Sequence, residues 1–308
     1  MKPAPFRYCA PETVDEALEL LATGDPEDEV KLLAGGQSLV PAMNFRLARP
    51  GLLIDLNRIA ELASIATRDD AEGSILRLGA MVRQSAAEHS PDVARLAPLM
   101  GEALPSVAHT QIRNRGTVGG SLAHADPAAE LPAVMLALDA RMHLRSVRGE
   151  RAVDAGDFFL GLFETALEPD EMLTAIEIDA ASAVEGSCFE EVSRRRGDYA
   201  LAGAAARVRL DADGTCRFAR LTFLSVADLP VRALEAEQML LGERPHDELL
   251  RAVAEHAARR EIDPGSDIHA SSAFRRHLAA GLARRTLATA VSRATAAHGA
   301  TDHGGASS

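Results

Sequence analysis

Lys31-Leu-Leu-Ala-Gly-Gly-Gln-Ser-Leu-Val-Pro-Ala-Met-Asn-Phe-Arg46 is echoed by Thr117-Val-Gly-Gly-Ser-Leu-Ala-His-Ala-Asp-Pro-Ala-Ala-Glu-Leu-Pro132. Each segment carries a Gly-Gly pair next to small hydroxyl residues, and we call residues 35–36 the first bend and residues 119–120 the second bend. Glycine lets a backbone adopt φ > 0 and approach a ligand without an intervening Cβ. Successive N–H groups in such a turn can converge on phosphate oxygens. If both bends bind the same diphosphate, they would enclose it from two sides, and we therefore predict a dinucleotide cofactor.

Neither bend matches a known phosphate-binding fingerprint. The G-x-G-x-x-G spacing of a dinucleotide-binding βαβ unit is absent, and no G-K-[ST] of a P-loop follows either pair. Hydroxyl and amide side chains nevertheless flank both bends: Gln37 and Ser38 follow the first, and Thr117 and Ser121 enclose the second. These side chains favour a ligand-binding role over a purely structural turn.

Length and charge restrict the class of protein. A chain of 308 residues predicts about two domains. The net charge of -12 argues against a nucleic-acid surface, which needs a basic patch. No apolar run approaches the ~20 residues that span a bilayer. The N-terminal residues lack the apolar segment of a secretory signal, so we expect a cytoplasmic protein without a membrane span.

The three cysteines, Cys9, Cys188 and Cys216, are far apart in the sequence. Four thiolates hold an iron–sulfur cluster, and Cys-rich zinc sites need paired cysteines. The spacing therefore excludes both from this chain, and we expect three small buried side chains. His109, His124 and Asp126 are potential metal ligands, but no second cluster of ligands accompanies them in the sequence, so we expect no metal site.

The pattern of apolar residues predicts an α+β protein. Thr13 and Glu16 predict the N-cap and capping box of a first helix. The expected strands are 30–34, 52–56, 75–79, 142–147, 172–178, 189–194, 204–210 and 218–226, with a hairpin turn at 211–214. The expected helices are 93–107, 127–138 (with Pro127 in its first turn), 231–241, 248–260 and 273–293. Residues 1–178 and 187–295 should form two domains, followed by a disordered tail at 296–308.

Several motifs in the same order resemble one family. Residues 34–41, 117–121 and 125–132, together with Arg194-Arg-Arg-Gly-Asp-Tyr-Ala200, are similar to the FAD-binding medium subunits of molybdenum hydroxylases, which include carbon monoxide dehydrogenase and xanthine dehydrogenase flavoproteins. The resemblance covers nearly the whole chain except the tail. It implies a two-domain FAD-binding fold of the PCMH (vanillyl-alcohol-oxidase-like) type, followed by a C-terminal domain of a sheet plus three helices.

The resemblance also implies a function. Such a subunit holds FAD non-covalently and passes electrons from the [2Fe-2S] clusters of a small partner, through FAD, to an external acceptor. Substrate is oxidised in a large molybdopterin-containing partner, and two heterotrimers form a heterohexamer. No residue of this chain is then a catalytic acid or base.

The family match places cofactor contacts on particular residues. The FAD-binding residues that it implies are Leu33, Ala34, Gly35, Gly36, Gln37, Ser38, Leu39, Val40, Val107, Thr117, Val118, Gly119, Gly120, Ser121, Glu130, Ala166 and Tyr199. Among them, Glu130 is expected on the ribose or adenine side, and Tyr199 near the isoalloxazine ring. Glu191 falls at or next to a position where many relatives carry a lysine close to the flavin, and a carboxylate cannot replace an ammonium as a donor.

Other interpretations remain open at the level of sequence. The run Arg194-Arg-Arg196 could contact nucleic acid, flavin or another subunit, and the acidic balance opposes the first. Ser121 lies in a loosened nucleophile elbow that lacks the second glycine. The alternatives for the whole chain are a stand-alone flavin oxidase of related fold and a non-catalytic nucleotide-binding module.

Overall fold

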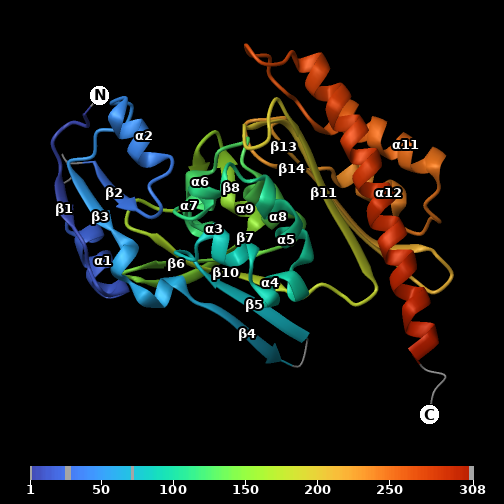
Figure 1. Ribbon diagram of the computed structural model, residues 1–308, viewed down its shortest axis with the longest axis horizontal. Coiled ribbons are helices and arrows are strands. Elements are labelled where there is room, and N and C mark those ends of the chain that lie inside the picture. The colour runs from blue at the N-terminus through green and yellow to red at the C-terminus, as the bar shows by residue number, and fades with distance from the viewer. Residues whose placement is uncertain (1, 25–28, 71–72, 305–308) are drawn as a thin grey trace.

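The computed structural model describes residues 2–24, 29–70 and 73–304 and shows three layers of structure along the long axis of the molecule (Figure 1). The N-terminal elements lie at one end, the central sheet and its helices in the middle, and the C-terminal sheet with helix α12 at the other end. The strands form sheets of three, five, four and two members within these residues.

The first layer is a small parallel sheet in the order β1-β3-β2. Its strands are β1 (Arg7–Cys9), β2 (Val30–Leu33) and β3 (Leu52–Asp55), accompanied by α1 (Val14–Ala22) and α2 (Leu39–Asn44). Thr13 caps α1 as predicted, because its side chain accepts a hydrogen bond from the Glu16 N–H at 3.2 Å. Strand β2 ends one residue before the first bend, which leads into α2.

The second layer is an antiparallel sheet in the order β4-β5-β10-β6-β7. Its strands are β4 (Ile65–Asp70), β5 (Gly73–Gly79), β6 (Arg141–Ser146), β7 (Gly149–Asp154) and β10 (Met172–Asp179). The helices that accompany it are α3 (Gln84–Glu88), α4 (Pro91–Leu96), α5 (Pro98–Ala103), α6 (Thr110–Arg113), α7 (Val118–His124), α8 (Glu130–Ala137) and α9 (Ala155–Phe158), with short 3-10 turns at Leu56–Arg58, Ala60–Ala63 and Leu104–Ser106. A short hairpin of β8 (Phe159–Gly161) and β9 (Glu164–Thr165) follows α9.

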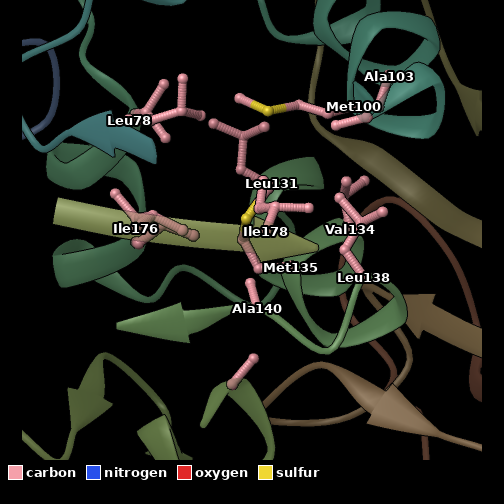
Figure 2. Close-up of a cluster of buried hydrophobic side chains, with 14 of the residues drawn as sticks. Leu78, Met100, Ala103, Leu131, Val134, Met135, Leu138, Ala140, Ile176 and Ile178 are labelled. Atoms are coloured by element: carbon pink, nitrogen blue, oxygen red, sulfur yellow. The ribbon is translucent and has the colours of Figure 1, made fainter. Parts of the chain in front are cut away.

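Helix α8 forms the centre of the largest hydrophobic core. Every residue of this helix is buried, which is typical of a helix that is apolar on all sides and covered on all sides. Its side chains gather with those of the central sheet and α5 in Figure 2, which labels Leu78, Met100, Ala103, Leu131, Val134, Met135, Leu138, Ala140, Ile176 and Ile178. Helix α8 also packs against the C-terminal sheet, so this core joins the two parts of the chain.

The third layer is an antiparallel sheet in the order β11-β12-β13-β14, covered by helices. It contains β11 (Glu185–Ser193), β12 (Ala200–Leu210), β13 (Cys216–Leu224) and β14 (Val231–Arg232), with α10 (Leu234–Leu240), α11 (Asp247–His256), a π-helical turn at Ala257–Glu261 and the long α12 (Ser272–Gly304). Helix α12 packs against β11 and β12 on the outer face of the sheet (Figure 1). Residues 211–214 connect β12 to β13, as predicted.

The expectations for two helices and for the tail were wrong. The single helix expected at 93–107 is divided into α4, α5 and a 3-10 turn. Pro98 restricts Ala97 to non-helical backbone, and Pro105 lacks the N–H that would continue the hydrogen bonds of α5. Helix α8 begins at Glu130 and excludes Pro127, because the Asp126 side chain accepts from the Ala128 N–H at 2.9 Å and closes a turn there. The tail expected to be disordered is helical through Gly304, and 305–308 lie outside the described residues.

Within the described ranges, no helix combines the length and the apolar character needed to cross a bilayer.

Candidate cofactor site

A cavity of about 650 Å³ opens where all three layers meet. Its volume lies within the range of ~300–1,000 Å³ that is usual for small-molecule sites. Both bends contribute to its wall, as do the segment before α6 and residues 197–199 between β11 and β12. The two bends therefore share one cavity, as the diphosphate hypothesis requires.

The first bend presents free backbone donors. Gly36 has φ of +74°, a conformation that favours glycine, and it turns the chain from β2 toward α2. Within the described residues, the backbone N–H groups of Gly36, Gln37 and Ser38 donate to no protein acceptor. The Gln37 side chain donates to the Gly35 carbonyl at 3.0 Å and stabilises the bend. Three successive unpaired amides beside a cavity fit an anionic ligand.

The second bend has a different role from the one predicted. It forms the first turn of α7, and its amides are already used: Val118 donates to the Val82 carbonyl, Gly119 to the Ala80 carbonyl, and Gly120 to the Thr117 hydroxyl oxygen. A Cβ on Gly119 would lie 2.7 Å from the Ala80 Cα. This glycine therefore allows α7 to pack against the central sheet, and the donors left for a ligand are the hydroxyls of Thr117 and Ser121.

The backbones of the two bend regions are in direct contact. A Cβ on Gly35 would lie 2.3 Å from the carbonyl oxygen of Arg115 and 2.8 Å from the Cα of Gly116. Only a glycine allows this approach, because both neighbours are backbone atoms. The structure thus explains why two segments about 80 residues apart form one wall.

The third wall comes from the C-terminal sheet. The loop between β11 and β12 brings Gly197, Asp198 and Tyr199 to the cavity. Gly197 has φ of +88°, and a Cβ there would lie 2.4 Å from two ring atoms of His109. Arg194 and Asp198 of the same loop form an ion pair at 3.6 Å. The loop is held across the cavity by packing on His109.

We expect Gly197→Ala to weaken cofactor binding roughly tenfold, because the methyl group would push the Tyr199 loop away from His109. Fluorescence titration of the apo chain with FAD measures this effect. Gly214→Ala is the matched control, since Gly214 has φ of +85° but open space around its Cβ position. Equal FAD affinities of the two variants would contradict a role for this contact.

Buried acidic groups lie on one side of the site. Glu130 begins α8 and is 6% exposed, and burial raises the pKa of its carboxyl to about 7. Burial, and then the nearby Glu130, raise the pKa of Glu191 to about 8. Glu191 does not line the cavity, and its Oε2 is buried without a partner among the described residues. Both carboxyls therefore keep their protons to a higher pH than exposed carboxyls do.

His124 lies in the cavity wall at the end of α7. Its ring lies 5.1 Å from that of Phe163 in the β8–β9 hairpin, and burial lowers the pKa of His124. A neutral imidazole can contact a cofactor, but within the described part of the chain His124 and Asp126 have no third metal ligand nearby. Among the residues that the structure describes, no group of three or more His, Cys, Asp or Glu side chains could hold a metal ion.

Most of the predicted site residues line the cavity. They are Ala34, Gly35, Gly36, Gln37, Ser38, Leu39, Val107, Thr117, Gly119, Gly120, Ser121, Glu130 and Tyr199. Four do not line it: Leu33 at the end of β2, Val40 in α2, the fully buried Val118, and Ala166, which packs against the main core. Val118 is completely buried, whereas Val40 is 40% exposed, so the four residues lie in different environments outside the cavity lining.

Sequence reasoning missed several lining residues. Examples are Met81, Gln84, Ile112, Leu167 and Leu173. Most of these are apolar, and a residue that faces a cavity then has the same pattern as a residue that faces the core. Polar lining residues such as Lys31, Gln84 and Glu171 offered a clearer signal, because a polar side chain close to buried segments needs a partner.

Comparisons with known proteins show the family to which the chain belongs. A family model described as the FAD binding domain in molybdopterin dehydrogenase matches residues 4–180, and one described as the CO dehydrogenase flavoprotein C-terminal domain matches residues 187–290. The chain belongs to this family of FAD-binding medium subunits, which confirms the resemblance seen in its motifs.

Particular relatives cover nearly the whole chain. The 6-hydroxypseudooxynicotine dehydrogenase complex subunit alpha of Paenarthrobacter nicotinovorans is 41% identical, over 98% of this chain and 100% of that protein. The carbon monoxide dehydrogenase medium chain of Hydrogenophaga pseudoflava is 37% identical over 95% and 99%. The solved structure of carbon monoxide dehydrogenase from that organism matches with a TM-score of 0.90 at 38% identity, over 95% of this chain and 99% of that one. The structure of quinoline 2-oxidoreductase from Pseudomonas putida 86 matches with a TM-score of 0.89, also at 38% identity, over 96% of this chain and 100% of that one.

Proposed function

We propose that this chain is the electron-transfer subunit of a heteromeric molybdenum hydroxylase, in which it carries FAD between the [2Fe-2S] clusters of a small partner and an external acceptor. A large molybdopterin-containing partner oxidises the substrate, and two heterotrimers assemble into a heterohexamer in the cytoplasm. The observation that carries the proposal is the single cavity formed by the two bends and the Tyr199 loop.

The residues of the cavity fit FAD. The free amides of Gly36, Gln37 and Ser38 would hold the diphosphate together with the hydroxyls of Thr117 and Ser121. Glu130 offers an acceptor for ribose hydroxyls, and Tyr199 offers an aromatic border for the ring system. Bound FAD supplies two-electron redox chemistry that the protein tunes through nearby hydrogen bonds and charges.

The other features of the chain support a division of labour. The three cysteines are unpaired thiols, as expected in a reducing compartment, and they are too few to hold a cluster of the Cys₄ type. Several relatives carry the words "complex subunit" or "medium chain" in their names. An electron carrier of this kind depends on partner chains for both the donor and the substrate chemistry.

Reconstitution with FAD tests the proposal. We expect the purified chain to take up one FAD per chain and to show a flavin absorption spectrum that dithionite bleaches. A chain that remains colourless after incubation with excess FAD would exclude a flavin subunit and favour the nucleotide-binding module.

Isolation of the native complex tests the partners. We expect an affinity-tagged chain to co-purify with a molybdenum-containing large chain and a small chain with iron and sulfide. A flavin-loaded chain that oxidises an organic substrate without any partner would favour the stand-alone oxidase instead.

A further inference from the structure

A pair of side chains outside the cavity wall connects the two bends. Asn57 lies in the turn after β3, and its Nδ2 donates to the carbonyl oxygen of Ala34 at 2.9 Å. Ala34 directly precedes the first bend. The same side chain therefore holds the peptide that leads into the unpaired amides of the first bend.

Arg83 links Asn57 to the region of the second bend. Its Nη2 donates to the Asn57 Oδ1 at 2.5 Å, and its Nη1 donates to the carbonyl oxygen of Arg115. That carbonyl oxygen is the atom closest to the Cβ position of Gly35. Asn57 thus holds the carbonyl of Ala34, Arg83 holds the carbonyl of Arg115, and the hydrogen bond between the two side chains connects the bend regions.

Asp55 and Tyr8 hold Asn57 in the required orientation. Asp55 Oδ1 accepts from the backbone N–H of Asn57 at 2.9 Å and from its Nδ2 at 2.5 Å, and the Tyr8 hydroxyl donates to Asp55 Oδ2 at 2.6 Å. The Asn57 amide cannot rotate by 180° without placing its oxygen against the Ala34 carbonyl and the Asp55 carboxylate. Its position is therefore determined by partners on three sides.

We infer that Asn57 and Arg83 are positioning residues that fix the spacing of the two bends and thereby set the affinity for FAD. This inference rests on the proposed function. Neither side chain lines the cavity, so both act through the carbonyls of Ala34 and Arg115. The planar guanidinium of Arg83 reaches two acceptors at once, which a lysine ammonium on a single stem reproduces poorly.

Variants of the full-length chain test the inference through FAD affinity. We expect Asn57→Ala and Arg83→Lys each to raise the Kd for FAD roughly three- to tenfold, in line with the loss of one or two hydrogen bonds. In the double variant the effects should be less than additive, because both changes break the same connection. Arg95→Lys is the control, since exposed Arg95 pairs with Asp92 on α4 and does not line the cavity.

Hydrogen–deuterium exchange of the apo chain provides a readout beyond binding. Backbone amides of residues 34–39 and 115–120 should exchange faster in both single variants, while those of the C-terminal sheet remain unchanged. Uniformly faster exchange would indicate a general loss of stability and overturn a positioning role. Variants with the FAD affinity and exchange of the wild type would overturn the inference alone, whereas a wild-type chain that takes up no FAD would overturn the proposed function with it.

Discussion

Alanine in place of Gly35 should abolish FAD binding at micromolar concentrations. The added Cβ would lie 2.3 Å from the Arg115 carbonyl oxygen and 2.8 Å from the Gly116 Cα. No side-chain rotation relieves contacts with backbone atoms, so the first bend must move away from the second. We expect the Kd for FAD to rise by at least about a hundredfold, and stability to fall by about 1–3 kcal/mol, which is the usual cost of overpacking.

Calorimetric titration with FAD and urea unfolding of the apo chain measure the two effects of Gly35→Ala. Gly156→Ala is the matched control, because Gly156 is helical and nothing lies within 4 Å of its Cβ position. We expect the control to bind FAD like the wild type and to be equally or slightly more stable. Normal FAD affinity in the Gly35 variant would show that the two bends do not need this contact.

Glu130→Gln should make the apo chain less sensitive to alkaline pH. The pKa of Glu130 is raised from 4.5 to about 7 in the folded protein, mainly by burial. Between these values the native state keeps a proton that the unfolded state has released, so the stability of the wild type decreases as pH rises through this window. The favourable contribution of the neutral carboxyl is complete below pH 4.5 and is lost above about pH 7.

The size of the effect follows from the shift. One pKa unit corresponds to ~1.4 kcal/mol. Between pH 5 and pH 8, the free energy of unfolding of the wild type should therefore fall by about 2–3 kcal/mol more than that of Glu130→Gln. Urea unfolding at both pH values measures the difference. Glu19→Gln, an exposed position on α1, is the control and should parallel the wild type. Parallel pH profiles of Glu130→Gln and wild type would contradict a buried, proton-binding carboxyl at this site.

The sequence predicted those parts of the fold that depend on local signals. Thr13 starts its helix through a capping side chain, and residues 211–214 close a hairpin because Asp and Gly suit the turn. Strands β4 and β7 were not predicted. They form the two edges of the central sheet and consist largely of charged and small residues, without the apolar alternation that marks a half-buried strand.

The candidate site was predictable only in part, for a similar reason. The Gly-Gly pairs suggested phosphate donors in both bends, yet the partners of an amide are long-range contacts that no motif displays. Gly119 donates to Ala80 of a distant segment and therefore has no free N–H for a ligand. Tyr199 was predicted as a site residue only from the family resemblance, because no periodic pattern in the sequence indicates that its loop borders the cavity.

The cavity walls have a consequence for biosynthesis. Lys31 lies near the start of the chain and Tyr199 two thirds of the way along it, yet both face the same space. Strand β12, which follows Tyr199, pairs with β13 at residues as late as Leu224. A ribosome must therefore extrude most of the polypeptide before the pocket can close, so flavin capture is a late, essentially post-translational event in the life of the chain.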